Sequence, residues 1–275
     1  MTSIPAQDIA GTRRPPGLQI LRDSGMRAVI YREFLLLTRN RTNLLLAVLP
    51  TAIYLLVFST SLTGLVGSIR YHGVLVSYPE FTIPAIMLSS MLAASSTTGT
   101  SLFQEEVGGM AVELWSYPLS RTAYIAGKII ATTGLVLVQS TAALLLGVLI
   151  FHVDWPVDHW LALAVGTVAA SLVFNAFFLM VATFVHDFQR FMVMINVLGP
   201  LLLFSSPSFY PVEQMPATLR VLSVLNPVTY GIGCIRDGAL FGLRSIWPTA
   251  LGLLAVAAGL IAVIAAVMNR RIRRL

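Results

Sequence analysis

Charged side chains are scarce in this sequence of 275 residues. Only 11% of the residues are Asp, Glu, Lys or Arg, against about 25% in an average soluble domain, while 56% are hydrophobic. This scarcity excludes an ordinary soluble enzyme, and the mean hydropathy of +0.81 excludes a disordered chain. The composition predicts an integral membrane protein, so the net charge of +6 is interpreted first as membrane topology rather than as affinity for nucleic acid.

The sequence also lacks the residues that many catalytic and metal sites need. Cys234 is the single cysteine, which excludes an intrachain disulfide and a cysteine-based metal cluster. Lys128 is the single lysine. A phosphate-binding P-loop requires a hydroxyl residue directly after its lysine and a second glycine five residues before its Gly-Lys pair. Gly127-Lys128 has neither of these residues. We therefore expect this chain to bind no cofactor and to hydrolyse no ATP itself.

Long apolar runs are what the sequence does contain. A bilayer core about 30 Å thick needs roughly 20 apolar residues per helix. The six predicted spans are residues 44–66, 81–103, 129–151, 160–185, 191–206 and 247–268. None of them holds an Asp, Glu, Lys or Arg, which argues against a membrane enzyme or a proton-coupled carrier, because these place ionisable groups inside their spans. The prediction is an all-α integral membrane protein with six transmembrane helices, in which residues 44–275 form a single transmembrane domain.

The basic residues predict how these spans are oriented. With the amino terminus inside, cytoplasmic segments carry 14 of the 18 basic residues and external segments carry 4. An excess of arginine and lysine marks the cytoplasmic side of a membrane protein. We therefore expect a multi-pass protein of the inner (plasma) membrane with both termini in the cytoplasm.

The region before the first span divides into two parts. Residues 1–23 form a polar tail, and residues 24–43 carry apolar residues at helical spacing, among them Val29, Ile30 and Phe34. The pattern predicts an interfacial helix whose apolar residues lie at the headgroup boundary while its arginines contact anionic lipid. The alternative is a plain cytoplasmic extension of the first span.

Four prolines interrupt the segment between the fifth and sixth spans, residues 207–246, whose apolar stretches are too short to cross a bilayer. Prolines that break apolar runs are typical of re-entrant elements buried against protein. The pattern predicts a re-entrant segment, and a loosely folded external loop is the alternative.

Hydroxylated and small side chains are concentrated in the second span, between Ser89 and Ser101. They let helices approach closely and form hydrogen bonds across the contact, and they equally suit the wall of a path of modest polarity. Three single amides, Gln139, Asn175 and Asn196, lie in the third, fourth and fifth spans. Helix packing and a substrate path both remain open for these residues.

Acidic residues gather in one cytoplasmic segment, residues 104–127, and apolar residues lie among them. The residues that define it are Glu105, Glu106, Glu113, Leu114, Trp115 and Arg121. A short amphipathic, acidic helix of this kind is suited to docking on a cytoplasmic protein. The alternative is a solvated turn with incidental acids.

Two motifs give the chain a resemblance to a known family. The first is FYPVEQMP at residues 209–216 followed by LNPVTY at residues 225–230, and the second is the acidic segment with YPLSR at residues 117–121. In these motifs the chain resembles the membrane subunits of ABC-2 type exporters, of the daunorubicin-resistance permease kind, over residues 26–275. It departs from the family's pattern where Glu105 and Glu106 stand next to each other, since a basic residue often separates these acids.

The resemblance implies a subunit that dimerises with a second copy or a related permease and pairs with two separate ATPase subunits. ATP and Mg would be bound by those partners, and the acidic segment would couple ATP hydrolysis to transport. The second and fifth spans would border the substrate path. The residues implied to line it are Ser89, Ser90, Thr97, Asn196 and Phe204. The residues implied for the re-entrant element that caps it are Tyr210, Pro211, Pro216, Asn226, Pro227 and Tyr230.

The sequence thus predicts the permease subunit of an ATP-driven exporter of hydrophobic drugs or lipid-like molecules. An exporter of polysaccharide or lipo-oligosaccharide is the alternative for the substrate. A membrane protein without an ATPase partner, such as a lipid scramblase, is the alternative for the class.

Overall fold

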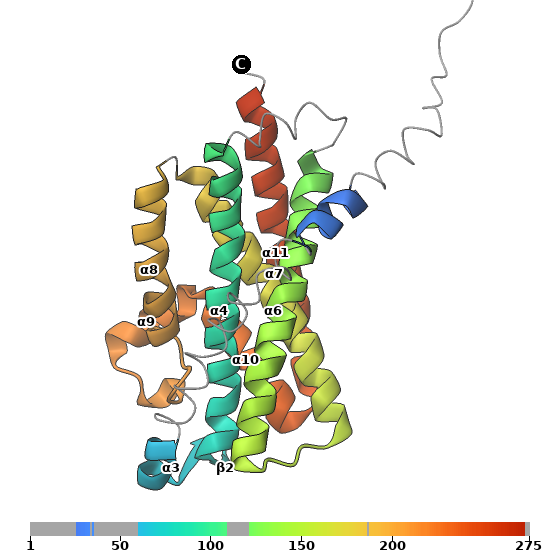
Figure 1. The fold of residues 1–275 in the computed structure, drawn as a ribbon. Coiled ribbons are helices and arrows are strands. Elements are labelled where there is room, and N and C mark those ends of the chain that lie inside the picture. Colours follow the sequence, from blue (N-terminus) through green and yellow to red (C-terminus); the bar gives the residue numbers. More distant parts are fainter. Residues whose placement is uncertain (1–25, 34, 36–59, 109–120, 186, 273–275) are drawn as a thin grey trace, which may run out of the picture.

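The computed structural model describes residues 26–33, 35, 60–108, 121–185 and 187–272, and its long helices run side by side in one upright bundle (Figure 1). Residues 26–33 are helical and are called the N-terminal helix below. The helices of the bundle are α4 (Tyr78–Val107), α6 (Arg121–Phe151), α7 (Val157–Phe184), α8 (Phe188–Phe204), α10 (Pro227–Phe241) and α11 (Leu243–Ile272). The shorter elements are α3 (Thr60–Val66), β1 (Ser68–Tyr71), β2 (Val74–Ser77), the 3-10 turn η2 (Val212–Gln214) and α9 (Ala217–Leu225).

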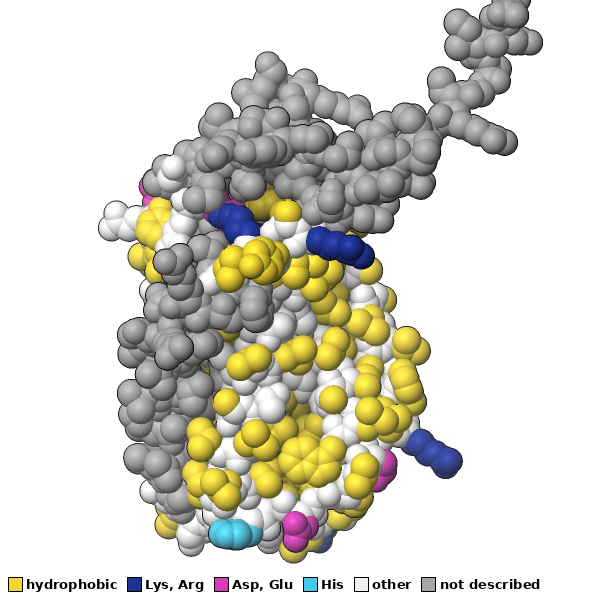
Figure 2. Space-filling view, turned by 45° about the vertical axis from the view of Figure 1, so that its right-hand side comes forward, with side chains coloured by type: hydrophobic (Ala, Val, Ile, Leu, Met, Phe, Trp, Pro, Cys, Tyr) yellow, Lys and Arg dark blue, Asp and Glu magenta, His cyan; other side chains and the backbone are white. Residues whose placement is uncertain are grey.

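Four described helices, α4, α6, α7 and α11, are long and apolar enough to cross a membrane. They confirm a mostly helical membrane protein and match the second, third, fourth and sixth predicted spans. Six spans are not shown. The fifth prediction corresponds to α8, which has 17 residues, and the first lies mostly outside the described residues, with only α3 visible at its end. Figure 2 shows hydrophobic side chains over the middle of one face of the bundle and charged ones toward its ends.

A β-hairpin precedes α4, so the prediction of a purely helical fold is corrected. β1 and β2 pair antiparallel, with Ile69 opposite Val76, and both of these side chains are buried. The turn is His72-Gly73, whose φ angles of 47° and 81° are those of a two-residue type I′ turn. The alternation of apolar and polar residues on both sides of this turn explains why the chain forms strands here.

Helix α4 extends beyond its predicted span at both ends, and α6 begins before its predicted span. At its start α4 has a capping box, in which the Ser77 hydroxyl accepts from the Glu80 backbone N–H at 3.4 Å and the Glu80 carboxylate accepts from the Ser77 backbone N–H at 3.2 Å. At the other end, α4 continues to Val107 and α6 already begins at Arg121. The predicted acidic loop, residues 104–127, is therefore helical at both of its ends. Glu105 does not end α4, because its carboxylate is buried and paired with Lys128 of α6.

The segment predicted to be re-entrant contains a sharp bend, since α9 and α10 meet at 87°. Pro227 cannot donate the backbone hydrogen bond that would continue α9 through this point. Asn226 starts α10 by accepting from the Val228 backbone N–H at 2.9 Å, and it donates to the carbonyl of Leu202 at the end of α8 at 2.6 Å. The bend is thus fixed by capping and by a bond to α8.

Helix α7 forms the centre of the bundle and contacts α11, α10, α4 and α6. Small residues along α7 allow this close packing, and Gly238 of α10 lies against the backbone of Ala162. Helix α8 lies at the edge and contacts chiefly α4 (Figure 1). Among the described helices α8 is thus held mainly by one neighbour, which leaves room for a groove beside it.

Gly99 lies where α4 meets α7 and α8, and a Cβ there would lie 2.7 Å from Cζ of Phe191 and 2.8 Å from the carbonyl oxygen of Phe178. The carbonyl belongs to the backbone, so the helices must separate. We expect Gly99→Ala to lower the free energy of unfolding by about 1–3 kcal/mol. Thermal unfolding in lipid nanodiscs measures this. Gly134→Ala on α6 is the control, because nothing lies within 4 Å of its Cβ. Equal stability of the two variants would contradict the close packing.

Candidate functional site

A groove of 360 Å³ lies between α4 and α8. Its wall from α4 carries Ser89 and Ser96, and its wall from α8 carries Asn196 and Phe204. A wider hollow of 580 Å³ shares Asn196 and Phe204 with the groove and reaches Tyr210. Three predicted path residues from two distant spans, Ser89, Asn196 and Phe204, therefore meet at one cavity.

The remaining two predicted path residues lie elsewhere on α4. Ser90 is buried and donates its hydroxyl to the carbonyl of Met87 at 2.7 Å, and Thr97 donates to the carbonyl of Ala94 at 2.6 Å. Neither lines the groove. The side chains that do line it are apolar, hydroxylated or amide, and the part of the chain that the structure describes contributes no charged group to this wall.

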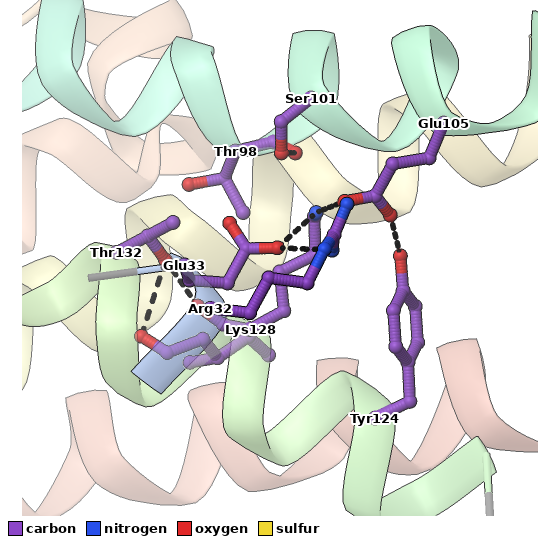
Figure 3. A network of polar contacts seen from close by, with 9 residues as sticks. Arg32, Glu33, Thr98, Ser101, Glu105, Tyr124, Lys128 and Thr132 are labelled. Atoms are coloured by element: carbon purple, nitrogen blue, oxygen red, sulfur yellow. Dashed lines mark hydrogen bonds and ion pairs between the residues drawn. The ribbon is translucent and has the colours of Figure 1, made fainter. Parts of the chain in front are cut away.

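A cluster of four charged side chains lies at the end of α4 that faces the N-terminal helix (Figure 3). Lys128 of α6 is fully buried, and its Nζ lies 3.0 Å from Oε1 of Glu105 and 3.2 Å from Oε1 of Glu33. Arg32 contacts the same two carboxylates, at 2.8 Å for Glu105 and 3.1 Å for Glu33. The hydroxyl of Tyr124 donates to the other carboxylate oxygen of Glu105. The cluster joins three segments that are far apart in the sequence.

The cluster contains two acids and two bases, so its formal charge is balanced. Burial of the Arg32 guanidinium lowers its pKa, but the hydrogen bond and the negative charge of Glu105 outweigh burial and raise it. Burial raises the pKa of the Glu33 carboxyl, and although Lys128 and Arg32 oppose this, the net shift is upward. Removing either partner of such a buried pair leaves an uncompensated charge, so all members depend on one another.

A second polar contact joins the middle of the bundle. Asn175 of α7 is fully buried, its Oδ1 accepts from the Thr98 hydroxyl of α4 at 2.8 Å, and its Nδ2 donates to the Thr133 hydroxyl of α6 at 3.0 Å. These bonds hold three helices together. Of the two interpretations left open for Asn175, the structure shows helix packing.

At the opposite end of the bundle, Arg236 of α10 is buried without an acidic partner in direct contact among the described residues. It donates to the carbonyls of Phe81 at 3.1 Å, Pro207 at 2.8 Å and Ser208 at 2.5 Å, and its guanidinium lies 3.6 Å from the centroid of the Phe81 ring. The next residue, Asp237, accepts from the Tyr71 hydroxyl at 2.8 Å. Burial raises the pKa of Tyr71, which keeps its hydroxyl protonated as a donor.

Sequence similarity shows which family this architecture represents. The profile of the ABC-2 type transporter family matches residues 25–240, which run from the N-terminal helix almost to the end of α10. The chain belongs to this family. Membership makes it a membrane transport subunit rather than an enzyme.

Two curated relatives illustrate the similarity of this ABC-2 chain to other permeases. "Inner membrane transport permease YadH" of Escherichia coli (strain K12) is 26% identical over 212 residues, which cover 76% of this chain and 80% of the relative. "Putative transport permease ycf38" of Cyanophora paradoxa is 25% identical over 210 residues, which cover 76% of this chain and 71% of the relative.

The predicted coupling residues of this ABC-2 chain are only partly visible. Glu105 is buried inside the charged cluster, Glu106 belongs to the last turn of α4, and Arg121 is the first residue of α6. Glu113, Leu114 and Trp115 lie outside the described residues. The docking role of the segment stays a prediction, and the structure adds that Glu105 faces other residues of its own chain. We did not predict its partners Arg32, Glu33, Tyr124 and Lys128, although the four-residue spacing of Tyr124 and Lys128 places both on one face of α6.

The residues predicted for the re-entrant element are placed around the α9–α10 bend. Pro211 precedes η2 and Pro216 precedes α9, where each starts a short helix. Tyr230 of α10 donates its hydroxyl to the carbonyl of Val224 in α9 at 2.8 Å, across the bend that Asn226 and Pro227 form. Tyr210 lines the hollow beside α8.

Proposed function

We propose that this ABC-2 chain is the permease subunit of an ATP-driven exporter in the inner membrane, and that the groove between α4 and α8 is part of its substrate path. The observation that carries the proposal is the meeting of Ser89, Asn196 and Phe204 at one cavity, because these residues come from spans that are distant in the sequence. Like the curated relatives whose names are given above, the chain would act as a transport permease.

The composition of the groove supports an uncharged or amphipathic substrate, of the hydrophobic drug or lipid-like class. A charged substrate that entered this mostly apolar groove would lose its hydration without gaining a counter-charge. Hydroxyls and one amide, such as Ser89 and Asn196, still offer single hydrogen bonds that orient a polar group.

The energy would come from partner subunits, since ABC-2 permeases pair with ABC ATPases. Two ATPases carrying ATP and Mg would dock on the cytoplasmic side, which the excess of basic residues assigns to the ends of α4 and α6 near the N-terminal helix. The charged cluster supports this assignment. Because Lys128 is paired with both Glu105 and Glu33, a force applied near the end of α4 would also move α6 and the N-terminal helix.

Gly199 of α8 lines the groove, and nothing lies within 4 Å of a Cβ at this position. We expect Gly199→Leu to fold normally but to fill the groove. Stimulation of the partner ATPase by hydrophobic drugs and lipids should then need about tenfold more compound, which corresponds to a loss of roughly 1.4 kcal/mol of binding. The measurement is a stimulation titration on the complex in lipid nanodiscs.

Gly259→Leu on α11 is the matched control, because it also adds a side chain into open space but lies away from the groove. Identical titrations for the two variants would contradict the assignment of the path. Failure of the permease to co-purify with any ATPase would contradict the exporter and favour a scramblase.

A further inference from the structure

A separate cavity of 230 Å³ lies at the end of the bundle opposite the charged cluster, between the β-hairpin and α10. It is smaller than the roughly 300–1,000 Å³ of pockets that hold a drug-sized molecule, so it suits a single ring or headgroup. The lining residues that carry the argument are His72, Thr229, Tyr230, Gly233, Arg236 and Asp237.

The polar groups of this cavity present donors and acceptors side by side. Three carbonyls accept from Arg236, and its guanidinium is also hydrogen-bonded to the Tyr71 hydroxyl, so one of its five N–H donors remains beyond those bonds. The contacts of Asp237 with Tyr71 and His72 both use Oδ1, at 2.8 and 3.8 Å. The hydroxyl oxygen of Thr229 is buried and has no hydrogen-bond partner among the described residues. Buried hydroxyls in folded proteins are nearly always hydrogen-bonded, so this one is open to a partner such as a water or a bound ligand.

The charges around the cavity nearly cancel. Arg236 and Asp237 are adjacent and of opposite sign, and both line the cavity. Glu213 also lines it, while Arg220 is held close by, donating to the Glu213 carbonyl at 3.0 Å. An ion entering such a balanced site would lose hydration without finding a net counter-charge, whereas a neutral hydroxylated group would satisfy the donors and the acceptors together.

The shape of the wall fits a ring. A Cβ at Gly233 would meet nothing within 4 Å, so this side of α10 is open to the cavity. The rings of Tyr230 and His72 contribute flat, partly exposed surfaces to the same wall. The C–H face of a small ring can pack on such surfaces while its hydroxyls reach Arg236, Asp237 and Thr229.

We propose that this cavity binds one uncharged, polyhydroxylated group of the sugar or polyol type, in which neighbouring hydroxyls pair with Asp237, Arg236 and Thr229. The inference deepens the proposed function, since such a group would be the head of an amphiphile that the permease handles. The same chemistry occurs in a lipid-like glycoside and in a free saccharide.

The test uses the permease without any ATPase, in lipid nanodiscs, and isothermal titration calorimetry. The probes share one alkyl chain and differ in the headgroup: hexyl β-glucoside, hexyltrimethylammonium and hexyl sulfate, with free glucose as a fourth probe. We expect saturable binding of hexyl glucoside, at least about tenfold weaker in Gly233→Leu and in Asp237→Asn. Binding of free glucose with similar affinity would assign the site to a soluble saccharide, and binding of the glucoside alone would assign it to a lipid-like one.

Gly259→Leu is the control and should bind hexyl glucoside as the parent chain does, because its added side chain also lies in open space. Similar thermal unfolding of Gly233→Leu and the control excludes misfolding as the cause of lost binding. Binding of a charged probe in place of the glucoside, no binding of either glucose probe, or glucoside binding that Gly233→Leu leaves unchanged would each overturn the inference. Because no ATPase is present, these results are independent of the test of the proposed function.

Discussion

Replacing Lys128 with methionine is expected to lower the free energy of unfolding by about 3–5 kcal/mol, the cost of breaking a buried ion pair by removing one partner. Methionine keeps an unbranched side chain of similar length but leaves Glu33 and Glu105 with Arg32 alone. Two buried carboxylates then share one cation. Thermal unfolding in lipid nanodiscs measures the loss of stability. Stimulation of the ATPase activity of the complex by substrate reports whether ATP hydrolysis stays coupled to transport.

The balance of charge can be restored in the same background. Adding Glu33→Gln to Lys128→Met leaves one acid and one base, so we expect about 1–3 kcal/mol of the loss to return as a coupling energy between the two sites. Arg27→Met on the same N-terminal helix is the control, because Arg27 is exposed, and it should change stability by less than about 0.5 kcal/mol. If the effects of Lys128→Met and Glu33→Gln simply added, the cluster would not act as one unit.

Arg236→Lys is expected to destabilise the protein almost as strongly, by about 3–5 kcal/mol, although it keeps the positive charge. A lysine ammonium cannot reach both the Phe81 carbonyl and the carbonyls of Pro207 and Ser208, which the planar guanidinium contacts from one position. Each hydrogen bond to a charged group contributes about 1.5–3 kcal/mol, and at least two are lost. Chemical unfolding of the purified permease measures the difference.

Arg244→Lys provides the comparison for that variant, because Arg244 is exposed near the start of α11. It should leave the free energy of unfolding within about 0.5 kcal/mol of the parent value. If Arg236→Lys and Arg244→Lys unfolded at the same denaturant concentration, the positive charge alone, and not the hydrogen bonds of the guanidinium, would hold α10 to α4.

The long helices could be predicted from the sequence because apolar length alone decides whether a helix can cross a bilayer. The charged cluster could not, since residues 33, 105 and 128 are distant in the sequence and nothing local shows that they meet. The predicted second span ends at residue 103 and the predicted third span begins at residue 129, so Glu105 and Lys128 lie outside both predictions. In the structure Glu105 and Lys128 neutralise each other inside the protein, so the helices continue past them.

The groove shows a finer limit of prediction. Ser89 and Ser96 lie seven residues apart and share a face of α4 that lines the groove, whereas Ser90 and Thr97 are each one position further along. One residue turns a helix by about 100°, which is enough to move a side chain off the wall. The β-hairpin could have been predicted from a local signal, because His72-Gly73 stands between two short runs in which apolar and polar residues alternate.

Helix α8 is fastened at both ends, and this limits how the groove can widen. Near its start, the ring of Phe191 packs against Phe103 with centroids 4.5 Å apart, and at its end Leu202 accepts from Asn226. Between these points Gly199 is followed by Pro200, which lacks the N–H that would bond to the carbonyl of Asn196. With both ends held, a widening of the groove would require α8 to bend. The missing hydrogen bond makes Gly199-Pro200 the point where the helix bends most easily, and both residues line the groove.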